Sequence, residues 1–201
     1  MFTLKKNKLH DRIRVCQVLI DERKYKSYLE IGCQSNTTFL KIICDKKIGV
    51  DPEKGGTHRM TSDQFFEQNT DRFDIVFIDG DHHHDQVTKD IENSLDVLNV
   101  GGCIVLHDCY PVNLVHEQLN GCGTVWRAFV KMREKRHDLD FVVLNYDHGV
   151  GVIRRGRQAN NICVDATMEE LTYKDLEQNV SEWLNLVKLD AFQDWLNGEW
   201  E

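Results

Sequence analysis

The chain has 201 residues, of which 41% are hydrophobic and 29% are charged, with a formal net charge of −8 at pH 7. This length suits one globular domain with a substantial core, and the composition excludes a disordered chain. The acidic balance argues against nucleic-acid binding, which needs a basic face, and no apolar stretch approaches the ~20 residues of a membrane span.

The cysteines bear on the compartment. The chain has seven of them, an odd number, with no CxxC pair, and several lie inside apolar runs. Reduced, partly buried thiols are typical of cytosolic proteins. The first residues also lack the apolar core of a secretory signal. We therefore expect a cytoplasmic protein without a membrane or nucleic-acid partner.

Helix-like and strand-like segments alternate in the first third of the chain. Apolar residues at helical spacing from Leu9 to Ile20 predict an N-terminal helix. The apolar runs 28–31 and 47–50 predict buried strands, and residues 38–43 between them predict a helix. A short helix is expected over residues 62–68.

The middle of the chain continues this alternation. Residues 73–78 form the clearest predicted strand, because the run is almost wholly apolar, as in a parallel sheet covered on both faces. The apolar stripe over residues 87–98 predicts a helix that breaks at Gly101 and Gly102. Residues 103–106 then read as a further buried strand.

The last two predicted strands are expected to run antiparallel to each other. A helix around Trp126 precedes the segments 141–146 and 150–153, which are joined by a short loop over residues 147–149 and resemble a hairpin. Strands that alternate with helices indicate parallel pairing with right-handed crossovers. The predicted fold is therefore α/β, a doubly wound, mostly parallel seven-stranded sheet that ends in an antiparallel hairpin.

The chain after the hairpin reads as helical. Thr172 is a candidate N-cap, followed by apolar residues at helical spacing over residues 176–187, and residues 192–196 extend the pattern. We expect one domain over residues 1–157, including the N-terminal helix, and a helical extension over residues 158–201. The aromatic tail, which includes Trp200, is expected to pack on the domain; a lid over the site and a homodimer surface are the alternatives.

Acidic and imidazole side chains follow the predicted strands. In open α/β sheets, ligands bind outside the carboxyl ends of the strands, which meet at one edge. The residues delivered there are Glu30 with Gly32, Asp51, Ser62 with Asp63, Asp79 to His82, and His107 with Asp108. One such residue would be ordinary turn chemistry, but five groups together indicate a site.

The first strand-to-helix turn has features of a nucleoside site. Gly32 allows close approach of the backbone, and Ser35, Asn36 and Thr37 offer hydroxyl and amide groups. Asp51 follows Gly32 at close to the ~20 residues at which an acidic side chain binds ribose hydroxyls. A plain βα turn is the alternative for this motif taken alone.

Taken together, these segments resemble the class I S-adenosylmethionine-dependent methyltransferases over about residues 25–156. The segments are YLEIG at 28–32, GVDP at 49–52, MTSDQFF at 60–66, FDIVFIDGDHHHDQVTKDI at 73–91 and GGCIVLHDCYP at 101–111. GTVWRAF at 123–129 looks like the branch of macrolide and sugar O-methyltransferases. The chain departs from the family in its first turn, where further glycines are usual and Gln34, Ser35 and Asn36 stand here.

The resemblance implies that the predicted domain binds S-adenosylmethionine. Glu30 and Gly32 would line the methionine end, Asp51 would hold the ribose, and Ser62 and Asp63 would lie by the adenine. The full set of expected cofactor-binding residues is Glu30, Gly32, Ser35, Asn36, Thr37, Asp51, Ser62, Asp63 and Asp79.

The resemblance also implies the chemistry. An alcohol becomes a good nucleophile when a base removes its proton or a metal holds its oxygen. In related sugar O-methyltransferases the Asp of a DGxH turn binds magnesium and its His is the base, which implies catalytic roles for Asp79 and His82. Asp79, Asp108 and His107 are the candidate ligands of a divalent cation such as Mg²⁺. His83 and His84 are expected to be exposed at a helix start, and a zinc site is disfavoured by the spacing.

The sequence thus predicts an enzyme that methylates a hydroxyl of a small acceptor such as a sugar or glycan precursor. The loop from Cys109 to Gly123 and the tail would shape the acceptor pocket. A nicotinamide-dependent Rossmann oxidoreductase is an alternative, disfavoured by the lack of a full GxGxxG turn and by the hairpin. A catalytically silent cofactor-binding protein is the second alternative.

Overall fold

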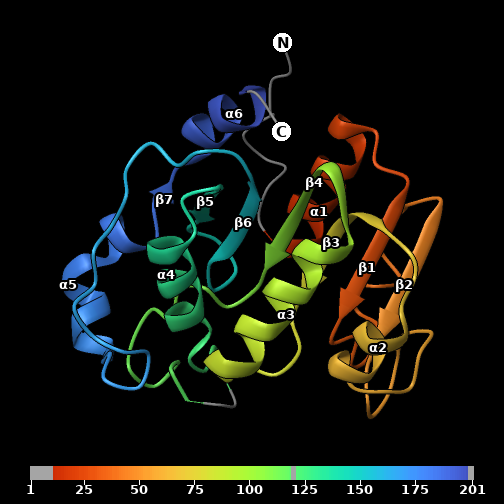
Figure 1. Ribbon diagram of the computed structural model, residues 1–201, viewed down its shortest axis with the longest axis horizontal. Coiled ribbons are helices and arrows are strands. Elements are labelled where there is room, and N and C mark those ends of the chain that lie inside the picture. Colours follow the sequence, from red (N-terminus) through yellow and green to blue (C-terminus); the bar gives the residue numbers. More distant parts are fainter. Residues whose placement is uncertain (1–10, 119–120, 199–201) are drawn as a thin grey trace.

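A seven-stranded sheet forms the centre of the protein (Figure 1), whose computed structural model describes residues 11–118 and 121–198. The strands are β1 (Ser27–Ile31), β2 (Lys46–Val50), β3 (Phe73–Ile78), β4 (Leu98–Leu106), β5 (Leu139–Leu144), β6 (Val150–Arg155) and β7 (Leu186–Val187). Their order across the sheet is β2-β1-β3-β4-β6-β5-β7. β1 to β4 pair in parallel, whereas β6 runs antiparallel to both β4 and β5.

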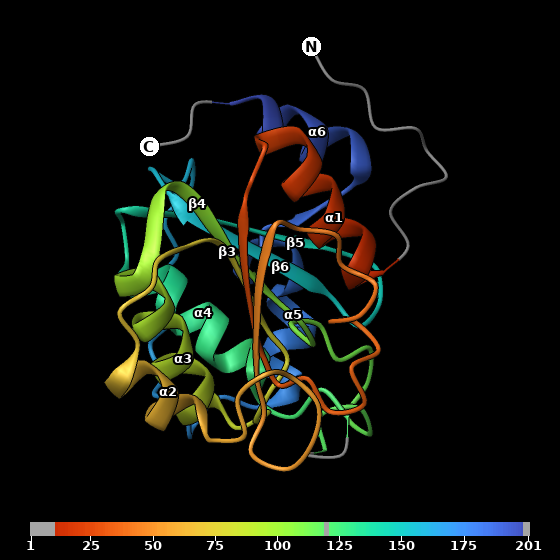
Figure 2. The same cartoon turned by 90° about the vertical axis from the view of Figure 1, so that its right-hand side faces the viewer.

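Helices cover both faces of this sheet (Figure 2). They are α1 (Arg12–Arg23), α2 (Ser62–Gln68), α3 (His84–Val97), α4 (Val125–Lys135), α5 (Tyr173–Trp183) and α6 (Leu189–Asn197). Buried side chains of α1 and α6 share one apolar cluster with one face of the sheet. Buried side chains of α2 to α5 share a second cluster with the opposite face. The predicted doubly wound α/β fold with an antiparallel hairpin is therefore confirmed.

The central strand β3 shows why its sequence is almost wholly apolar. Ile75 and Phe77 pack into the cluster with α1 and α6, whereas Val76 and Ile78 pack into the cluster with α3 and α4. Successive side chains of a strand point to opposite faces, and both faces here are covered. The strand consequently lacks the alternation of apolar and polar residues that a half-exposed strand would show.

The predicted helix over residues 38–43 is wrong. The structure has turns there, and the chain reaches β2 without a helix. The ammonium group of Lys47 donates hydrogen bonds to the backbone carbonyls of Phe39 and Ile42, both at 2.7 Å. These carbonyls are bound by a side chain from β2 instead of by later backbone N–H groups. Phe39 and Ile42 still pack against the apolar cluster around α1, so the turns cover that part of the sheet.

The helix before β4 ends earlier than expected. The prediction placed its break at Gly101 and Gly102, but α3 ends at Val97 and Leu98 already pairs with Phe73 in the sheet. The side-chain amide of Asn99 donates a 2.7 Å hydrogen bond to Asp74. Sheet pairing therefore begins where the helical spacing still appeared to continue.

The tail is more irregular than one long helix. Thr172 caps α5 as predicted, with its side chain accepting a hydrogen bond from the backbone of Asp175. Val187, predicted to be helical, instead lies in β7 and pairs in parallel with Leu144. Leu9 and Trp200 lie outside the described residues. The seventh strand of the predicted sheet thus comes from the tail, at the edge beyond the hairpin.

The tail is also joined to the domain by Arg133, which is 2% exposed. Its guanidinium donates to the backbone carbonyls of Trp183 at 3.1 Å and Asn160 at 3.0 Å. A buried guanidinium needs such acceptors, because an unpaired buried charge is costly. The division of the chain at residue 157 stays a prediction.

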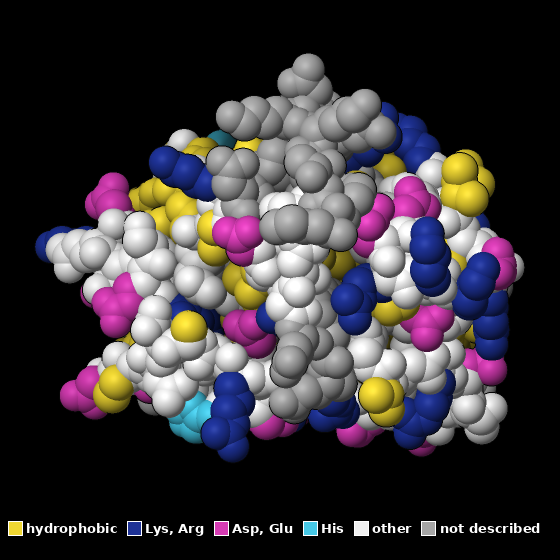
Figure 3. All heavy atoms as spheres, turned by 90° about the horizontal axis from the view of Figure 1, so that it is seen from above, with side chains coloured by type: hydrophobic (Ala, Val, Ile, Leu, Met, Phe, Trp, Pro, Cys, Tyr) yellow, Lys and Arg dark blue, Asp and Glu magenta, His cyan; other side chains and the backbone are white. Residues whose placement is uncertain are grey.

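Two general surface features complete the fold. In Figure 3, which shows the end of the molecule that carries α6, basic and acidic side chains are interspersed rather than gathered by sign. Among the helices of residues 11–118 and 121–198, none has the length and apolar character needed to cross a bilayer.

Candidate active site

A cavity of about 1090 Å³ opens at the carboxyl ends of the parallel strands. The predicted site residues that line it are Glu30, Gly32, Ser35, Thr37, Asp51, Ser62, Asp63, Asp79, His82, His107 and Asp108. Asn36, which was also expected to bind the cofactor, is not among the lining residues. The carboxyl edge therefore brings together residues that are far apart in the sequence, as parallel strand pairing requires.

The turn after β1 depends on a glycine. Gly32 has a φ of +87°, and a Cβ built there would lie 2.1 Å from the backbone oxygen of Asp79. Gln34 and Asn36 also have left-handed backbone conformations, with φ of 43° and 63°. The Asn36 side chain stabilises this turn by accepting a 2.6 Å hydrogen bond from the backbone of Gly56. Asn36 thus serves the turn itself, which explains its position outside the cavity lining.

Asp51 at the end of β2 is held by backbone N–H groups. Its carboxylate accepts from Gln34 at 2.7 Å, from Glu53 at 2.9 Å and from Lys54 at 2.8 Å. Burial alone would raise its pKa, but these hydrogen bonds lower the pKa below its usual value. A carboxylate offers about four acceptor positions, so Asp51 keeps capacity for a further donor in the cavity.

Glu30 lies at the end of β1 and is 1% exposed. The Tyr28 hydroxyl donates a hydrogen bond to its carboxylate. Burial raises the pKa of Glu30 to about 7, and the nearby charge of Asp79 acts in the same direction. A buried carboxyl group that lines a cavity is stabilised in its charged form by a cationic ligand.

This position predicts a pH dependence of stability. A carboxyl group whose pKa is raised on folding stabilises the protein fully below its unfolded pKa, and this contribution is lost as the pH rises through about 7. Relative to Glu30→Gln, the ligand-free protein should therefore lose about 3 kcal/mol of unfolding free energy between pH 4.5 and pH 8. Urea denaturation across this range measures the difference. The exposed Glu22→Gln should follow the unsubstituted chain, and an identical profile for Glu30→Gln would contradict the prediction.

A polar cluster lies where α2 meets α3. The side-chain amide of Gln86 donates to Ser62 at 3.2 Å, to Asp63 at 2.9 Å and to Asp90 at 3.1 Å. Burial raises the pKa of Asp90 to about 6. Sequence analysis missed Gln86 and Asp90, although both line the cavity. Their spacing of four residues on one predicted helix was the available signal, because it places both side chains on the same face.

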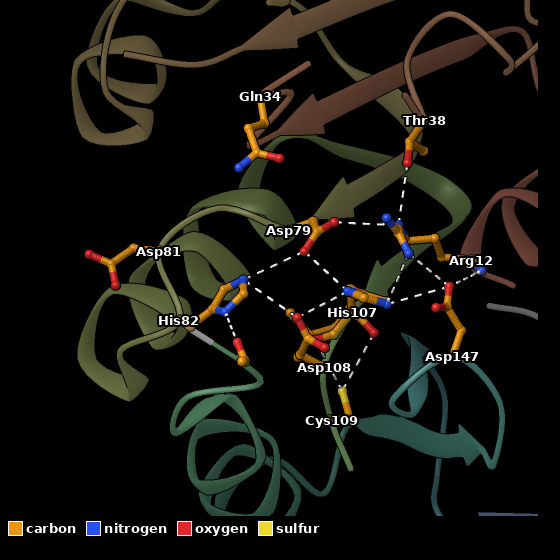
Figure 4. Close-up of polar contacts among 12 residues, drawn as sticks. Arg12, Gln34, Thr38, Asp79, Asp81, His82, His107, Asp108, Cys109 and Asp147 are labelled. Carbon is orange, nitrogen blue, oxygen red and sulfur yellow. Dashed lines mark hydrogen bonds and ion pairs between the residues drawn. The ribbon is translucent and has the colours of Figure 1, made fainter. Parts of the chain in front are cut away.

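His82 is anchored through its backbone and one ring nitrogen, and its ring faces Asp79 and Asp108 (Figure 4). The backbone oxygen of Gly121 lies 2.5 Å from Nδ1, and the N–H of Thr124 donates to the His82 carbonyl at 2.8 Å. Nε2 then faces Asp79 at 3.6 Å and Asp108 at 3.5 Å. The nearby carboxylate of Asp79 raises the pKa of His82, although burial opposes this. With Nδ1–H donating to Gly121, Nε2 is the nitrogen that can accept a proton.

His107 lies at the centre of the carboxylates. Its Nδ1 is 3.2 Å from Asp79 Oδ1 and 3.1 Å from Asp108 Oδ2, and its Nε2 is 3.5 Å from Asp147 Oδ2. Burial alone would lower its pKa, but the hydrogen bonds with these carboxylates raise the pKa to about 11. His107 is therefore a hydrogen-bond donor to the acidic groups around it.

Arg12, the first residue of α1, reaches into the same group of side chains (Figure 4). Its guanidinium lies 2.9 Å from Asp147 Oδ2 and 3.5 Å from Asp79 Oδ2, and its Nε donates to Thr38 at 3.3 Å. Sequence analysis missed Arg12 and assigned Asp147 only to the hairpin loop. Arg12 follows no strand, so the strand-end pattern held no signal for it. Asp147 follows β5, which runs in the same direction as β1 to β4, but the sequence analysis took this segment only as part of a hairpin.

The residues around Asp79 can be tested for a divalent cation. Asp79, His82 and Asp108 each offer a ligand atom within 4.8 Å of the others. However, the same oxygens of Asp79 and Asp108 contact His107 Nδ1, and the second oxygen of Asp79 contacts Arg12. A ring nitrogen that donates to carboxylates has no lone pair free on that side. This arrangement does not fit Mg²⁺, which prefers near-octahedral oxygen ligands.

The neighbouring histidines differ from each other. His83 is exposed at the start of α3, as expected, and acts as its N-cap. The prediction for His84 is wrong, since this residue is 4% exposed and its Nδ1 lies 3.0 Å from the Thr124 hydroxyl. The helix start is covered by the loop before α4, a long-range contact that local sequence does not encode.

The chain is similar to known methyltransferases in sequence and in fold. Residues 52–109 match a family model described as a methyltransferase domain. The methyltransferase PaMTH1 of Podospora anserina, solved with SAH, is 19% identical, with a TM-score of 0.57 over 75% of this chain and 81% of that chain. The O-methyltransferase TomG of Streptomyces achromogenes, solved with SAM, is 15% identical, with a TM-score of 0.55 over 71% of this chain and 78% of that chain. No curated protein matches the sequence.

The chain therefore has the fold of the class I methyltransferases. The family match over residues 52–109 agrees with the expected resemblance to the S-adenosylmethionine-dependent members of that class.

Proposed function

We propose that this protein is an S-adenosylmethionine-dependent methyltransferase that methylates a hydroxyl group of a small polar acceptor. The observation that carries the proposal is the shared cavity. Glu30 and Asp51, at the ends of adjacent strands, line the same cavity as the anchored imidazole of His82. PaMTH1 was solved with SAH, and TomG is an O-methyltransferase solved with SAM, which supports the same cofactor and reaction here.

Each part of the cofactor has a matching side chain. The spare acceptor capacity of Asp51 suits the ribose hydroxyls, and Ser62 and Asp63 offer polar atoms for the adenine. Glu30 suits the cationic methionine end, since a positive charge beside it stabilises its ionised form. The absence of a side chain at Gly32 lets the turn after β1 lie against the Asp79 backbone, which places this turn at the cavity.

His82 supplies the base for the proposed reaction. The acceptor oxygen forms a bond to the methyl carbon while the bond from that carbon to sulfur breaks, which yields S-adenosylhomocysteine. The hydroxyl proton passes to His82 Nε2, and the carboxylates of Asp79 and Asp108 stabilise the imidazolium that results. The protein otherwise contributes by holding the reactants in line.

The acceptor end of the cavity is lined by polar side chains. Arg12, His116, Asp147 and His148 lie there in addition to the residues named above. Hydrogen-bond donors and acceptors together favour a hydroxylated acceptor, such as a sugar or glycan precursor, over a purely apolar one. The polar lining also supports transfer to oxygen.

Calorimetric titration of the full chain with S-adenosylmethionine, S-adenosylhomocysteine and NAD tests the proposal. We expect both adenosyl ligands to bind and Asp51→Asn to weaken their binding about tenfold to a hundredfold, because a hydrogen bond to a charged acceptor is lost. Thermal unfolding of the variant checks that it folds. The exposed Asp45→Asn serves as the control and should bind normally. Binding of NAD without either adenosyl ligand would reject the proposal and favour an oxidoreductase.

A further inference from the structure

We propose that the side chains of His107 and Arg12 take the place of a divalent cation between Asp79 and Asp108, so that methyl transfer at this site is metal-independent. This inference rests on the proposed function for its catalytic part. Its structural part, the lack of a cation site, stands on the contacts of these four side chains alone.

The carboxylate oxygens nearest to His82 already have a partner in the protein. Asp79 Oδ1 and Asp108 Oδ2 are the atoms that face His82, and they would also face a bound cation. His107 Nδ1 lies within 3.2 Å of both oxygens. A single N–H donor therefore lies between the two carboxylates and contacts both of the oxygens that a shared metal ion would approach.

Arg12 lies beside the other acidic oxygens of this group. Asp79 Oδ2 lies 3.5 Å from Arg12 Nε, and Asp147 Oδ2 lies 2.9 Å from Arg12 Nη1. His107 Nε2 is 3.4 Å from Arg12 Nη1 and 3.5 Å from Asp147 Oδ2. Both basic side chains thus face the same carboxylates from adjacent positions. A divalent cation at Asp79 would be added next to the permanent charge of Arg12, which repels it.

The basic and the acidic side chains of this group thus have different roles. His107 and Arg12 are positioning residues, because they hold Asp79 and Asp108 in the orientation that faces His82. The carboxylates stay available to stabilise the imidazolium of His82, without an exchangeable ion. His107, which the sequence predicted to be a metal ligand, instead contacts both carboxylates through its ring nitrogen.

Binding of Mn²⁺, followed by electron paramagnetic resonance, tests the inference without any methyl acceptor. We expect the unsubstituted full chain to bind Mn²⁺ no more tightly than about 1 mM, the range of weak oxygen sites. His107→Glu places a third carboxylate beside Asp79 and Asp108, and should bind one equivalent at least tenfold more tightly. His107→Gln is the matched control of similar size without an acid, and should not gain a site.

The results of these experiments distinguish failure of the inference from failure of the proposed function. A tight Mn²⁺ site in the unsubstituted chain that is lost in Asp108→Asn would overturn the inference. Unchanged Mn²⁺ affinity in His107→Glu, with thermal melting showing that this variant is folded, would overturn it as well. S-adenosylmethionine affinity, measured in the same samples with EDTA and with Mg²⁺, should differ by less than twofold. A chain that binds neither Mn²⁺ nor S-adenosylmethionine would reject the proposed function while leaving the lack of a cation site supported.

Discussion

Replacing Gly32 with alanine is expected to abolish S-adenosylmethionine binding and to lower the free energy of unfolding by about 3 kcal/mol. The backbone there has a φ of +87°, which costs an L-residue about 1–2 kcal/mol. The new Cβ would also lie 2.1 Å from the Asp79 backbone oxygen, and relieving such a clash adds roughly 1–3 kcal/mol. The required shift moves the turn after β1 away from β3. Chemical denaturation and calorimetric titration measure the two effects.

Gly101→Ala is the matched control for this variant. Gly101 has a similar φ of +74°, but a Cβ there would meet no atom within 4 Å. We expect a loss of about 1–2 kcal/mol from the backbone conformation alone, with unchanged cofactor binding. Equal losses in the two variants would show that the close approach of Gly32 to Asp79 does not matter.

Replacing His82 with glutamine is expected to lower turnover by a factor of about 10² to 10⁴, the usual contribution of a positioned base. Glutamine retains a donor for the Gly121 carbonyl but cannot accept a proton at neutral pH. S-adenosylmethionine affinity should stay within twofold, because the cofactor is assigned to Glu30, Asp51 and the turn after β1. Formation of S-adenosylhomocysteine with a hydroxylated acceptor measures turnover.

His83→Gln is the control for the base, since His83 follows directly in the chain and its ring is exposed. Its turnover should match that of the unsubstituted protein within about twofold. Full activity in His82→Gln would mean that another group removes the proton, and the role assigned to Nε2 would be withdrawn.

The fold could be predicted largely from apolar runs and the residues that end them. β3 is apolar because both of its faces are covered, and Asp79 follows it at the edge where parallel strands deliver side chains. The same rule placed Glu30, Asp51 and Asp108 in one cavity. These inferences succeeded because they depend on strand direction alone, which the alternation of helices and strands indicates.

The remaining features depend on contacts between distant residues. Arg12 and Asp147 are 135 positions apart and meet only after α1 packs on the sheet next to the hairpin. The turns over residues 38–43 depend on Lys47, a side chain of the next strand. Likewise, β7 forms because Val187 pairs with Leu144 at the open edge of β5. Local periodicity contains none of this information.

Because Arg12 lies at the start of α1, the two halves of the cavity should lose their structure at different temperatures. The cofactor half is built from β1, β2 and α2, whereas the acceptor half also needs a helix that precedes the whole sheet. α1 contacts the sheet through side chains, whereas β1 and β3 are hydrogen-bonded to strands on both sides. Elements with few hydrogen bonds to the rest of the fold open at lower free energy than central strands. Moderate heating should therefore abolish methyl transfer at a temperature at which S-adenosylmethionine still binds, below the temperature of global unfolding.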